Sequence, residues 1–352
     1  MSIDSAPSGL TTETHTPTDK TGLDLGAWLA KGSLVVVLVA LVIVFTLING
    51  STFFSSDVLR LVLSTQATVG VIALAVTVAS VVGQVDLSVA GVMGGSAGIA
   101  ALQAADGASS VVAIASALLY ALVFGLANGL LVTYARMGSI IATLATGTIA
   151  TGVGLAIVGP ETITTTSAGF LNLFSSTVGG IQTAFFILVA LTIGATTVLQ
   201  GSLLGRRLFF VGQNKDAASL LGIKVRRLTI GSMGIASLLA GFAGVMLTGQ
   251  NGGASVTQTG GYLLPAFAAT FLGTSAIVPG RFNAVGTFIA AYVLGTALIG
   301  LNMAGVPQWS SYLFNGGLLI VALGAFEVVK LRKARAAKRA SVSAASAGVS
   351  HA

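Results

Sequence analysis

Residues 111–134 read VVAIASALLYALVFGLANGLLVTY and contain no charged side chain. A run of this length matches the roughly 20 apolar residues with which an α-helix crosses a bilayer. Comparable runs follow one another through residues 32–200 and 228–329. They are continuously apolar, whereas the strands of a membrane β-barrel alternate apolar and polar residues. The sequence therefore predicts an all-α polytopic membrane protein and argues against a barrel.

Ten apolar segments can be separated, which predicts about ten transmembrane helices. The second and third are the hardest to divide, because only the short polar break Gly83-Gln84-Val85-Asp86 interrupts them. The predicted spans are 33–49, 58–82, 87–105, 111–134, 139–158, 178–200, 228–249, 262–278, 284–301 and 309–329.

The distribution of charge predicts how these spans are oriented. The 352 residues include only 17 Lys and Arg and 10 Asp and Glu, too few to cover a water-soluble surface. With the N-terminus in the cytoplasm, ten spans place every basic residue except Arg60 on the cytoplasmic side, as the positive-inside rule requires. We therefore expect a multi-pass protein of the cytoplasmic (inner) membrane with both termini cytoplasmic. The net charge of +7 then reports topology and contact with anionic lipid, and not nucleic-acid binding.

Composition also limits the chemistry of the chain. It has no cysteine, and its two histidines, His15 and His351, lie in polar tails, which argues against a thiolate or histidine centre and against a metal site. The Ser, Thr and Ala-rich ends at 1–24 and 340–352 are expected to be unfolded. The predicted organisation is a disordered cytoplasmic tail (1–31), a transmembrane domain (32–329) and a basic cytoplasmic tail (330–352).

Small and amide side chains inside the spans are expected to hold helices together. Glycines recur at four-residue spacing as Gly91/Gly95, Gly94/Gly98 and Gly125/Gly129, which lets helix backbones approach closely. Asn128, Asn302 and Asn315 are expected to hydrogen-bond between helices.

The longest polar loop, residues 201–227, reads GSLLGRRLFFVGQNKDAASLLGIKVRR. Asn214 is a suitable N-cap for a short helix over Lys215–Leu221, and Gly222 can end that helix. The helix offers Ala217, Leu220 and Leu221 to a groove on a partner protein. The alternative is a basic helix resting on anionic lipid. The small Ala-Ala pair and the terminal glycine favour docking.

Four stretches together resemble the sugar-type permeases of ABC importers, the ribose/xylose family. The pattern G-x-N-x-x-A-A-x-x-x-G from Gly212 to Gly222 resembles the coupling loop of that family, and Gly83–Val89 (GQVDLSV) resembles its G-x-x-D-L-S-V signature. Residues 138–148 and 266–306 resemble two further blocks, and the resemblance runs in order over about residues 55–325. The branched-chain amino-acid permeases are related, but the G-x-x-D-L-S-V segment favours the sugar branch.

This resemblance implies an ABC importer permease that forms a dimer with a second copy or a paralogue. It further implies two cytoplasmic ATP-binding cassette subunits and an extracytoplasmic solute-binding protein as partners. The chain contains no G-x-x-x-x-G-K-[ST] phosphate loop, so ATP hydrolysis is expected on a separate chain and no cofactor on this one. The residues expected to couple to the ATPase are Gly212, Asn214, Lys215, Asp216, Ala217, Ala218, Leu220, Leu221 and Gly222.

Asp86 permits two interpretations. An acid within a membrane could carry a coupled ion, which would suit a stand-alone ion-driven secondary transporter. Alternatively Gly83, Asp86 and Ser88 break the helix, with Asp86 capping the next span or contacting the cytoplasmic side. The second interpretation is preferred, because cap chemistry explains the local D-x-S sequence. No other carboxylate lies in the middle of a predicted span, where an ion-coupled carrier would be expected to have one.

Candidate pathway residues are the polar side chains of otherwise apolar spans, Thr143, Thr146 and Asn302. The two threonines share a helical face, but threonine hydroxyls often bond to their own helix backbone instead. We therefore expect the permease subunit of an ATP-driven sugar importer. A membrane scaffold acting through the basic segment 330–339 is a third, non-transport alternative.

Overall fold

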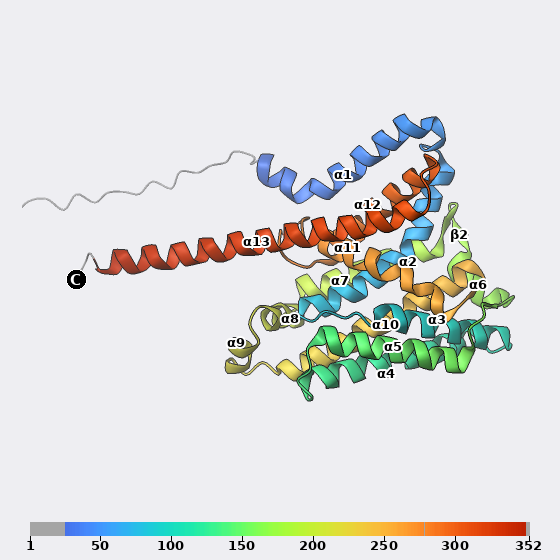
Figure 1. Ribbon diagram of the computed structural model, residues 1–352, viewed down its shortest axis with the longest axis horizontal. Helices are drawn as coiled ribbons and strands as arrows, with labels where there is room; N and C mark the ends of the chain where they lie inside the picture. Colours follow the sequence, from blue (N-terminus) through green and yellow to red (C-terminus); the bar gives the residue numbers. More distant parts are fainter. Residues whose placement is uncertain (1–24, 278, 350–352) are drawn as a thin grey trace, which may run out of the picture.

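The protein is a bundle of α-helices whose long members run side by side (Figure 1). The computed structural model describes residues 25–277 and 279–349. Short strands form two antiparallel pairs, β1 (Ile163–Thr164) with β4 (Gly253–Ala254) and β2 (Thr177–Val178) with β3 (Ile181–Gln182). The α-helices are α1 (Leu25–Asn49), α2 (Ser56–Val81), α3 (Val89–Ala105), α4 (Ser110–Thr133), α5 (Ser139–Val158), α6 (Ala168–Ser175), α7 (Thr183–Thr196), α8 (Leu203–Gln213), α9 (Lys215–Leu220), α10 (Val225–Asn251), α11 (Leu263–Gly273), α12 (Ala284–Met303) and α13 (Trp309–Val349). Other helical turns are η1 (Gly50–Thr52), η2 (Thr197–Gly201) and η3 (Val256–Tyr262).

Among the described residues, eight helical segments are long and apolar enough to cross a membrane. They correspond to eight of the ten predicted spans, and the predicted all-α polytopic class is confirmed. The spans are Gly32–Thr52, Ser56–Val81, Ser110–Thr133, Ser139–Val158, Thr183–Gly201, Val225–Asn251, Ala284–Met303 and Trp309–Val328.

The other two predicted spans, 87–105 and 262–278, contain short helices. α3 has 17 residues and follows a non-helical segment that ends at Ser88. α11 has 11 residues and follows the 3-10 helix η3. These non-α segments pack against the bundle: the Thr259 hydroxyl of η3 donates to the Ala90 carbonyl of α3 at 2.9 Å. Backbone outside an α-helix is tolerated at membrane depth only where it is buried in protein or lines a cavity.

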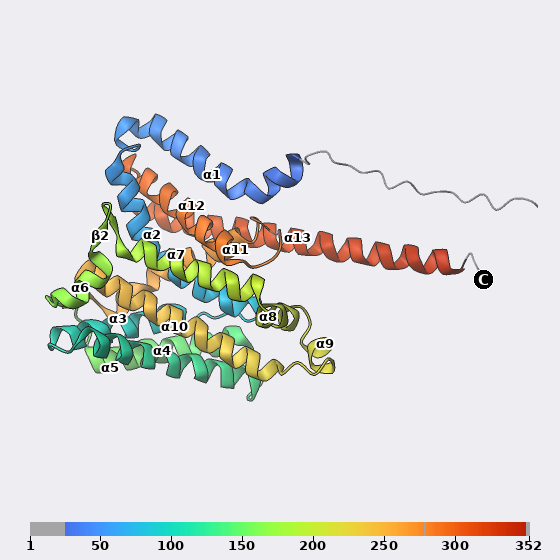
Figure 2. The same cartoon turned by 180° about the vertical axis from the view of Figure 1, so that it is seen from behind.

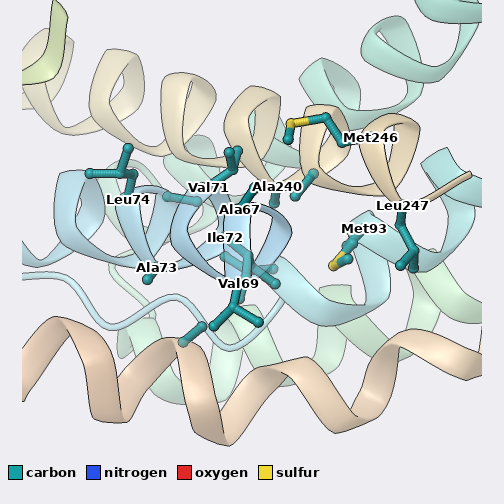
Figure 3. Packing of buried hydrophobic residues seen from close by; sticks show 14 of the residues in the cluster. Ala67, Val69, Val71, Ile72, Ala73, Leu74, Met93, Ala240, Met246 and Leu247 are labelled. Atoms are coloured by element: carbon teal, nitrogen blue, oxygen red, sulfur yellow. The ribbon is translucent and has the colours of Figure 1, made fainter. Parts of the chain in front are cut away.

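The centre of the bundle is formed by α2, α3 and α10. About 78% of the most apolar stretch of α2 is buried, compared with 11% for the first span and 6% for the last. Small and branched side chains of α2 pack against α3 and α10 in one buried cluster, and Figure 3 shows Ala67 and Val71 of α2 close to Ala240 of α10. The outermost helices expose Val, Ile and Leu, as expected for surfaces that face lipid.

Glycines at four-residue spacing pack helices together, as predicted. A Cβ on Gly91 would collide with the Gly147 carbonyl of α5, and one on Gly95 with the Tyr120 ring of α4. A Cβ on Gly129 would lie 2.7 Å from the Cα of Ile230 on α10. Similarly close approaches occur at Gly94 and Gly98 against Val256 and at Gly125 against Ser237.

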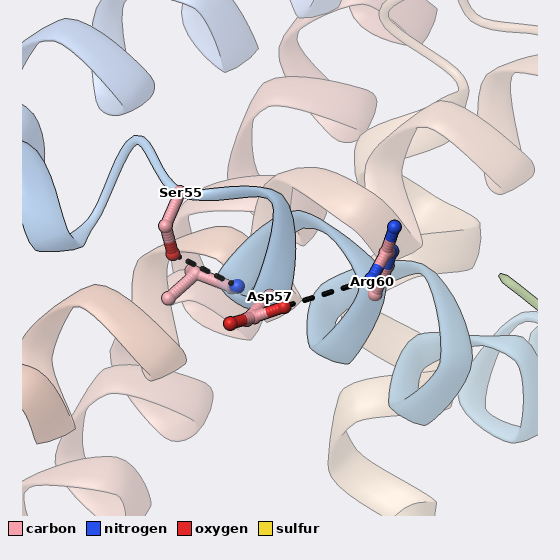
Figure 4. Close-up of polar contacts among 4 residues, drawn as sticks. Ser55, Asp57 and Arg60 are labelled. Carbon is pink, nitrogen blue, oxygen red and sulfur yellow. Dashed lines mark hydrogen bonds and ion pairs between the residues drawn. The ribbon is translucent and has the colours of Figure 1, made fainter. Parts of the chain in front are cut away.

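The two ends of the bundle differ. α8, α9 and the C-terminal half of α13 lie at one end, and α6 and the β2–β3 turn lie at the other (Figures 1 and 2). Arg60, the one basic residue predicted to lie outside, is at the end opposite to α9. Its guanidinium is 3.7 Å from Asp57 in the first turns of α2, which Ser55 caps (Figure 4). The fold therefore reproduces the predicted separation of charge, and which end is cytoplasmic stays a prediction.

The predicted tails differ from the structure. Residues 1–24 of the predicted disordered tail (1–31) lie outside the described residues, and α1 begins at Leu25 because the segment LGAWLA continues the apolar helix. The prediction that 340–352 is unfolded was wrong as far as Val349, since α13 continues through the basic tail. The Ala, Lys and Arg residues of this tail are strong helix formers, which composition alone did not take into account.

Candidate functional site

The loop that sequence analysis singled out folds into two short helices joined at Asn214. The Asn214 Oδ1 accepts hydrogen bonds from the N–H groups of Asp216 at 3.1 Å and Ala217 at 2.9 Å. Gly222, which follows α9, has φ of +75°, a conformation that side chains other than glycine rarely adopt. The predicted cap and stop are therefore both present, and α9 ends one residue earlier than predicted, at Leu220.

The faces of α9 are strongly unequal. Leu220 and Leu221 are 89% and 70% exposed, which is unusual for leucines at the polar end of a membrane bundle. Lys215 and Asp216 are also exposed, and Ala217 is half-buried. Ala218 is fully buried within the chain, so its side chain is not available to a partner. The apolar surface that α9 offers to a partner is therefore made of the two leucines.

A small apolar cluster attaches α8 and α9 to the end of α2. It contains Val81, Val82, Leu208, Phe209 and Ala218, with Leu199 and Val211. Two glycines make this contact close: a Cβ on Gly212 would collide with the Val81 carbonyl, and one on Gly83 would lie 3.2 Å from the Gly212 carbonyl oxygen. The two motifs, far apart in sequence, therefore meet backbone to backbone.

Gly83 also begins the helix break that was predicted from the sequence. Its φ of +71° turns the chain out of α2, and the next residues run without helical hydrogen bonds to α3. Asp86 is fully buried, and its Oδ1 accepts from the Ser88 N–H at 2.9 Å and the Ser88 hydroxyl at 2.5 Å. This turn ends one residue before α3, so Asp86 organises the entry to the helix without bonding N–H groups inside it.

Side chains of α5 satisfy the backbone of this break. The Thr143 hydroxyl accepts from the Leu87 N–H at 3.0 Å and lies 3.2 Å from the Val85 carbonyl, while the Ser139 hydroxyl accepts from the Val85 N–H at 3.2 Å. These hydroxyls replace helix hydrogen bonds that the segment cannot make, which matters where water is scarce. The Val85–Ser88 turn is thus fastened to the N-terminal turns of α5.

Asn128 of α4 extends the same network. Its Nδ2 donates to the Ser88 hydroxyl at 2.7 Å, and its Oδ1 accepts from the Thr146 hydroxyl. The interhelical bonding predicted for Asn128 is confirmed. The structure therefore brings Asp86, Ser88, Thr143 and Thr146 into one buried cluster with Asn128.

This placement bears on the two candidate pathway threonines. Thr143 is fully buried and Thr146 is 5% exposed, and both hydroxyls are hydrogen-bonded within the chain. In the single chain they support the break and line neither of the two polar cavities described below. Ser139 was not singled out from the sequence, although a polar residue in an apolar span is a usable signal. Asn128 was expected to bond between helices, but its place beside Ser88 was not predicted.

Asn302 lies elsewhere, beside the α12–α13 connection at the end opposite to α9. It borders a cavity of about 690 Å³ between the start of α11 and the adjoining ends of α12 and α13, here named the α12–α13 cavity. A second cavity of about 530 Å³ opens near α9, between Gly83, Gly212 and Arg281. There the Arg281 guanidinium lies 3.8 Å from the centre of the Phe209 ring, a contact not anticipated from sequence.

Sequence comparison identifies the family to which this architecture belongs. A protein-family model described as the permease component of the branched-chain amino acid transport system matches residues 58–323. The chain belongs to this family. The matched range includes the break, the coupling segment and both cavities' main walls, so the elements described above are those of a transport permease.

Individual relatives match over most of their length. The ribose import permease protein of Bacillus subtilis (strain 168) is 33% identical to this permease over 80% of this chain and 88% of its own. The ribose import permease protein of Escherichia coli (strain K12) is 29% identical over 84% of this chain and 94% of its own. The L-arabinose ABC transporter permease protein of Azospirillum brasilense is 26% identical over 89% of this chain and 92% of its own. No solved structure matches the chain.

These matches confirm the resemblance identified from the sequence motifs. The protein is a multi-pass membrane permease and not a scaffold, and its relatives are importer components and not stand-alone ion-driven carriers. The roles of individual site residues are not tested by these matches and stay predictions.

Proposed function

We propose that this permease is the membrane subunit of an ATP-driven importer that moves a sugar or sugar-like solute into the cell. Support comes from the relatives that match nearly end to end, which are permeases for ribose and L-arabinose. The observation that carries the coupling part of the proposal is α9: a capped helix at one end of the bundle, with Leu220 and Leu221 exposed and its other face fixed to α2.

In this proposal α9 docks into a groove on a cytoplasmic ATP-binding cassette subunit. Two adjacent exposed leucines at the end of a helix supply the apolar anchor for such a groove, with Lys215 and Asp216 at its rim. ATP would be used by that separate subunit, since this chain has no phosphate loop and needs no cofactor of its own.

Movement of α9 has a physical route into the membrane. α8 and α9 are fixed to the end of α2 by the apolar cluster and by the contact between Gly212 and Gly83. Gly83 begins the break, and the break is hydrogen-bonded to Ser139 and Thr143 of α5. A displacement of α9 is therefore transmitted to α2, to the break and to α5, which is how ATP-driven closure would change access to the solute pathway.

The remaining partners belong to the same proposal. A second permease copy or a paralogue completes the membrane channel, and an extracytoplasmic binding protein delivers the solute to the end opposite to α9. The strongly exposed apolar faces of the outer helices leave ample surface for a second copy and for lipid.

The test is a pull-down in mild detergent from the native membrane, combined with an uptake assay. The tagged wild-type chain should recover a P-loop ATPase, and cells containing it should accumulate labelled ribose or arabinose. The double variant Leu220→Ser/Leu221→Ser should insert normally but lose the ATPase and the uptake. The matched control is Val178→Ser, a residue 60% exposed at the other end, which should retain both.

Recovery of the wild-type chain alone, under conditions that preserve a control ABC complex, would contradict the proposal. Unchanged ATPase recovery in the double leucine variant would contradict the assigned role of α9 while leaving the importer itself in place.

A further inference from the structure

The α12–α13 cavity has a lining unlike the rest of the bundle. This one cavity gathers two asparagines, a glutamine, a serine and a tyrosine: Asn302, Asn315, Gln308, Ser311 and Tyr312. Its volume of about 690 Å³ falls within the range of small-molecule sites in proteins. A purely structural contact between helices would not leave so much space beside so many hydrogen-bonding groups.

The chemistry of the lining specifies the kind of solute. None of the residues that line the cavity carries a charge, so an anion or a cation would lose its hydration without compensation. Amide groups both donate and accept hydrogen bonds, and hydroxyl groups do the same, which matches the alternating needs of a polyhydroxylated molecule. The Tyr312 ring adds an apolar surface beside a polar tip.

One of these amides is incompletely bonded. The Asn315 Oδ1 is buried and has no hydrogen-bond partner among the described residues, contrary to the interhelical bond predicted for it. An unpartnered buried oxygen is costly. Because the side chain borders the cavity and its terminal torsion is soft, a hydroxyl group in the cavity can supply the missing donor.

The position of the cavity fits a solute on its way through the permease. It lies at the end opposite to α9 and reaches Gly260 and Gly261, where η3 gives way to the short helix α11. The cavity near α9 is less suitable for a neutral solute, since Arg281 and Glu327 both line it. The polar cavity is therefore the one placed to receive solute before the path narrows.

We infer that the α12–α13 cavity is a low-affinity binding site for a neutral sugar, formed by Asn302, Gln308 and Asn315, through which the solute passes after leaving the binding protein. This inference rests on the proposed function and adds the site at which the permease itself contacts its solute.

The absence of cysteine makes a direct test possible. The variants Asn302→Cys and Gln308→Cys each carry the only thiol of the chain, which a charged, membrane-impermeant methanethiosulfonate reagent can label. Labelling is followed on the purified chain after treatment of whole cells with and without D-ribose or L-arabinose. The matched control is Thr162→Cys, an exposed loop position that does not border the cavity.

The transported sugar should slow labelling at both cavity positions at least several-fold and leave Thr162→Cys unchanged. Failure of the reagent to reach either cavity position, or equal labelling with and without a sugar that the cells do accumulate, would overturn the inference. Uptake by the unmodified chain is measured first: if no sugar is accumulated, the proposed function fails before the cavity is tested.

A second variant tests the same inference without cysteine chemistry. A Cβ on Gly261 meets open space, and its φ is not in the left-handed region, so Gly261→Leu fills the cavity without disturbing the backbone. Uptake should fall at least tenfold while ATPase recovery is unchanged. Gly317→Leu on α13, which also meets open space but does not line the cavity, is the control and should transport normally. Normal uptake by Gly261→Leu would contradict the inference.

Discussion

Single hydroxyl groups decide whether a membrane helix can be interrupted. Between Gly83 and Ser88 the backbone leaves the α-helix, and its N–H groups need partners that lipid cannot supply. Ser139 and Thr143 supply them from α5, and Asn128 supplies the next link from α4. The break is therefore stabilised by side chains of α4 and α5 and does not depend on its own sequence alone.

The first prediction concerns Thr143. Thr143→Val has almost the same shape but leaves the Leu87 N–H without its acceptor, so it should destabilise the protein by about 1 to 3 kcal/mol. Thr148→Val on the same helix removes a hydroxyl that is exposed and bonds only to its own helix, to the Leu144 carbonyl, and should be close to neutral. Thermal unfolding in detergent compares the two, and equal melting temperatures would contradict this account of the break.

Gly212 carries the second prediction. A methyl group at Gly212 has no room beside the Val81 carbonyl, so Gly212→Ala must push α8 away from α2. The variant should still bind the ATPase subunit but lose most of its sugar uptake, because α9 is no longer fixed to the break. Gly201→Ala nearby, where a Cβ meets nothing within 4 Å, should behave as wild type. Recovery of the ATPase subunit and sugar uptake are measured on the same variants. Normal uptake by Gly212→Ala would rule out transmission from α9 through the contact between Gly212 and α2.

At the scale of elements, the short helix α9 depends on its neighbours for its stability. α9 has 6 residues, too few to be stable by itself. Its N-cap and its apolar contact with the end of α2 therefore determine whether the helix forms. Asn214 bonds two of its first N–H groups, and Ala218 anchors its inner face.

Asn214 is therefore the third test. Asn214→Ala should cost about 1 kcal/mol of helix stability and weaken recovery of the ATPase, because the two leucines lose their fixed presentation. Asn214→Asp keeps an oxygen at the cap and should restore recovery close to wild type. Hydrogen exchange of the 215–221 amides reports the helix directly, and equal exchange in both variants would show that the cap is unimportant.

Sequence predicted these elements unequally, for identifiable reasons. Asn214 and Gly222 act through local chemistry, so α9 could be placed to within a residue. The break at Gly83 was also predicted, but its partner Ser139 was not. Asn128 was expected to bond between helices, but its bond to Ser88 was not predicted, because this contact joins distant segments. α11 was predicted as a full span since hydropathy counts apolar residues and is insensitive to whether η3 is an α-helix.

At the scale of the whole molecule, the two ends of the bundle carry different tasks. α9 and the break form one end, and the α12–α13 cavity opens at the other. The importer mechanism requires one orientation of the bundle in the membrane: the cavity must face the binding protein and α9 must face the ATPase. The positive-inside count supports that direction, since Arg60 is the only basic residue on the cavity side in the described ranges 25–277 and 279–349.

Orientation is the last prediction, and the cysteine-free chain allows it to be measured. A thiol introduced at Val178 or Thr162 should react with an impermeant reagent in intact cells, because both positions are exposed at the end opposite to α9. A thiol introduced at Leu220 should react only after the membrane is permeabilised, although Leu220 is the more exposed of the two leucines at the end of α9. The reverse pattern would place α9 outside the cell, where no ATP is available, and would contradict the importer mechanism as a whole. Reaction at both ends in intact cells would instead contradict the crossing of the membrane by the span Thr183–Gly201, which separates Thr162 and Val178 from Leu220.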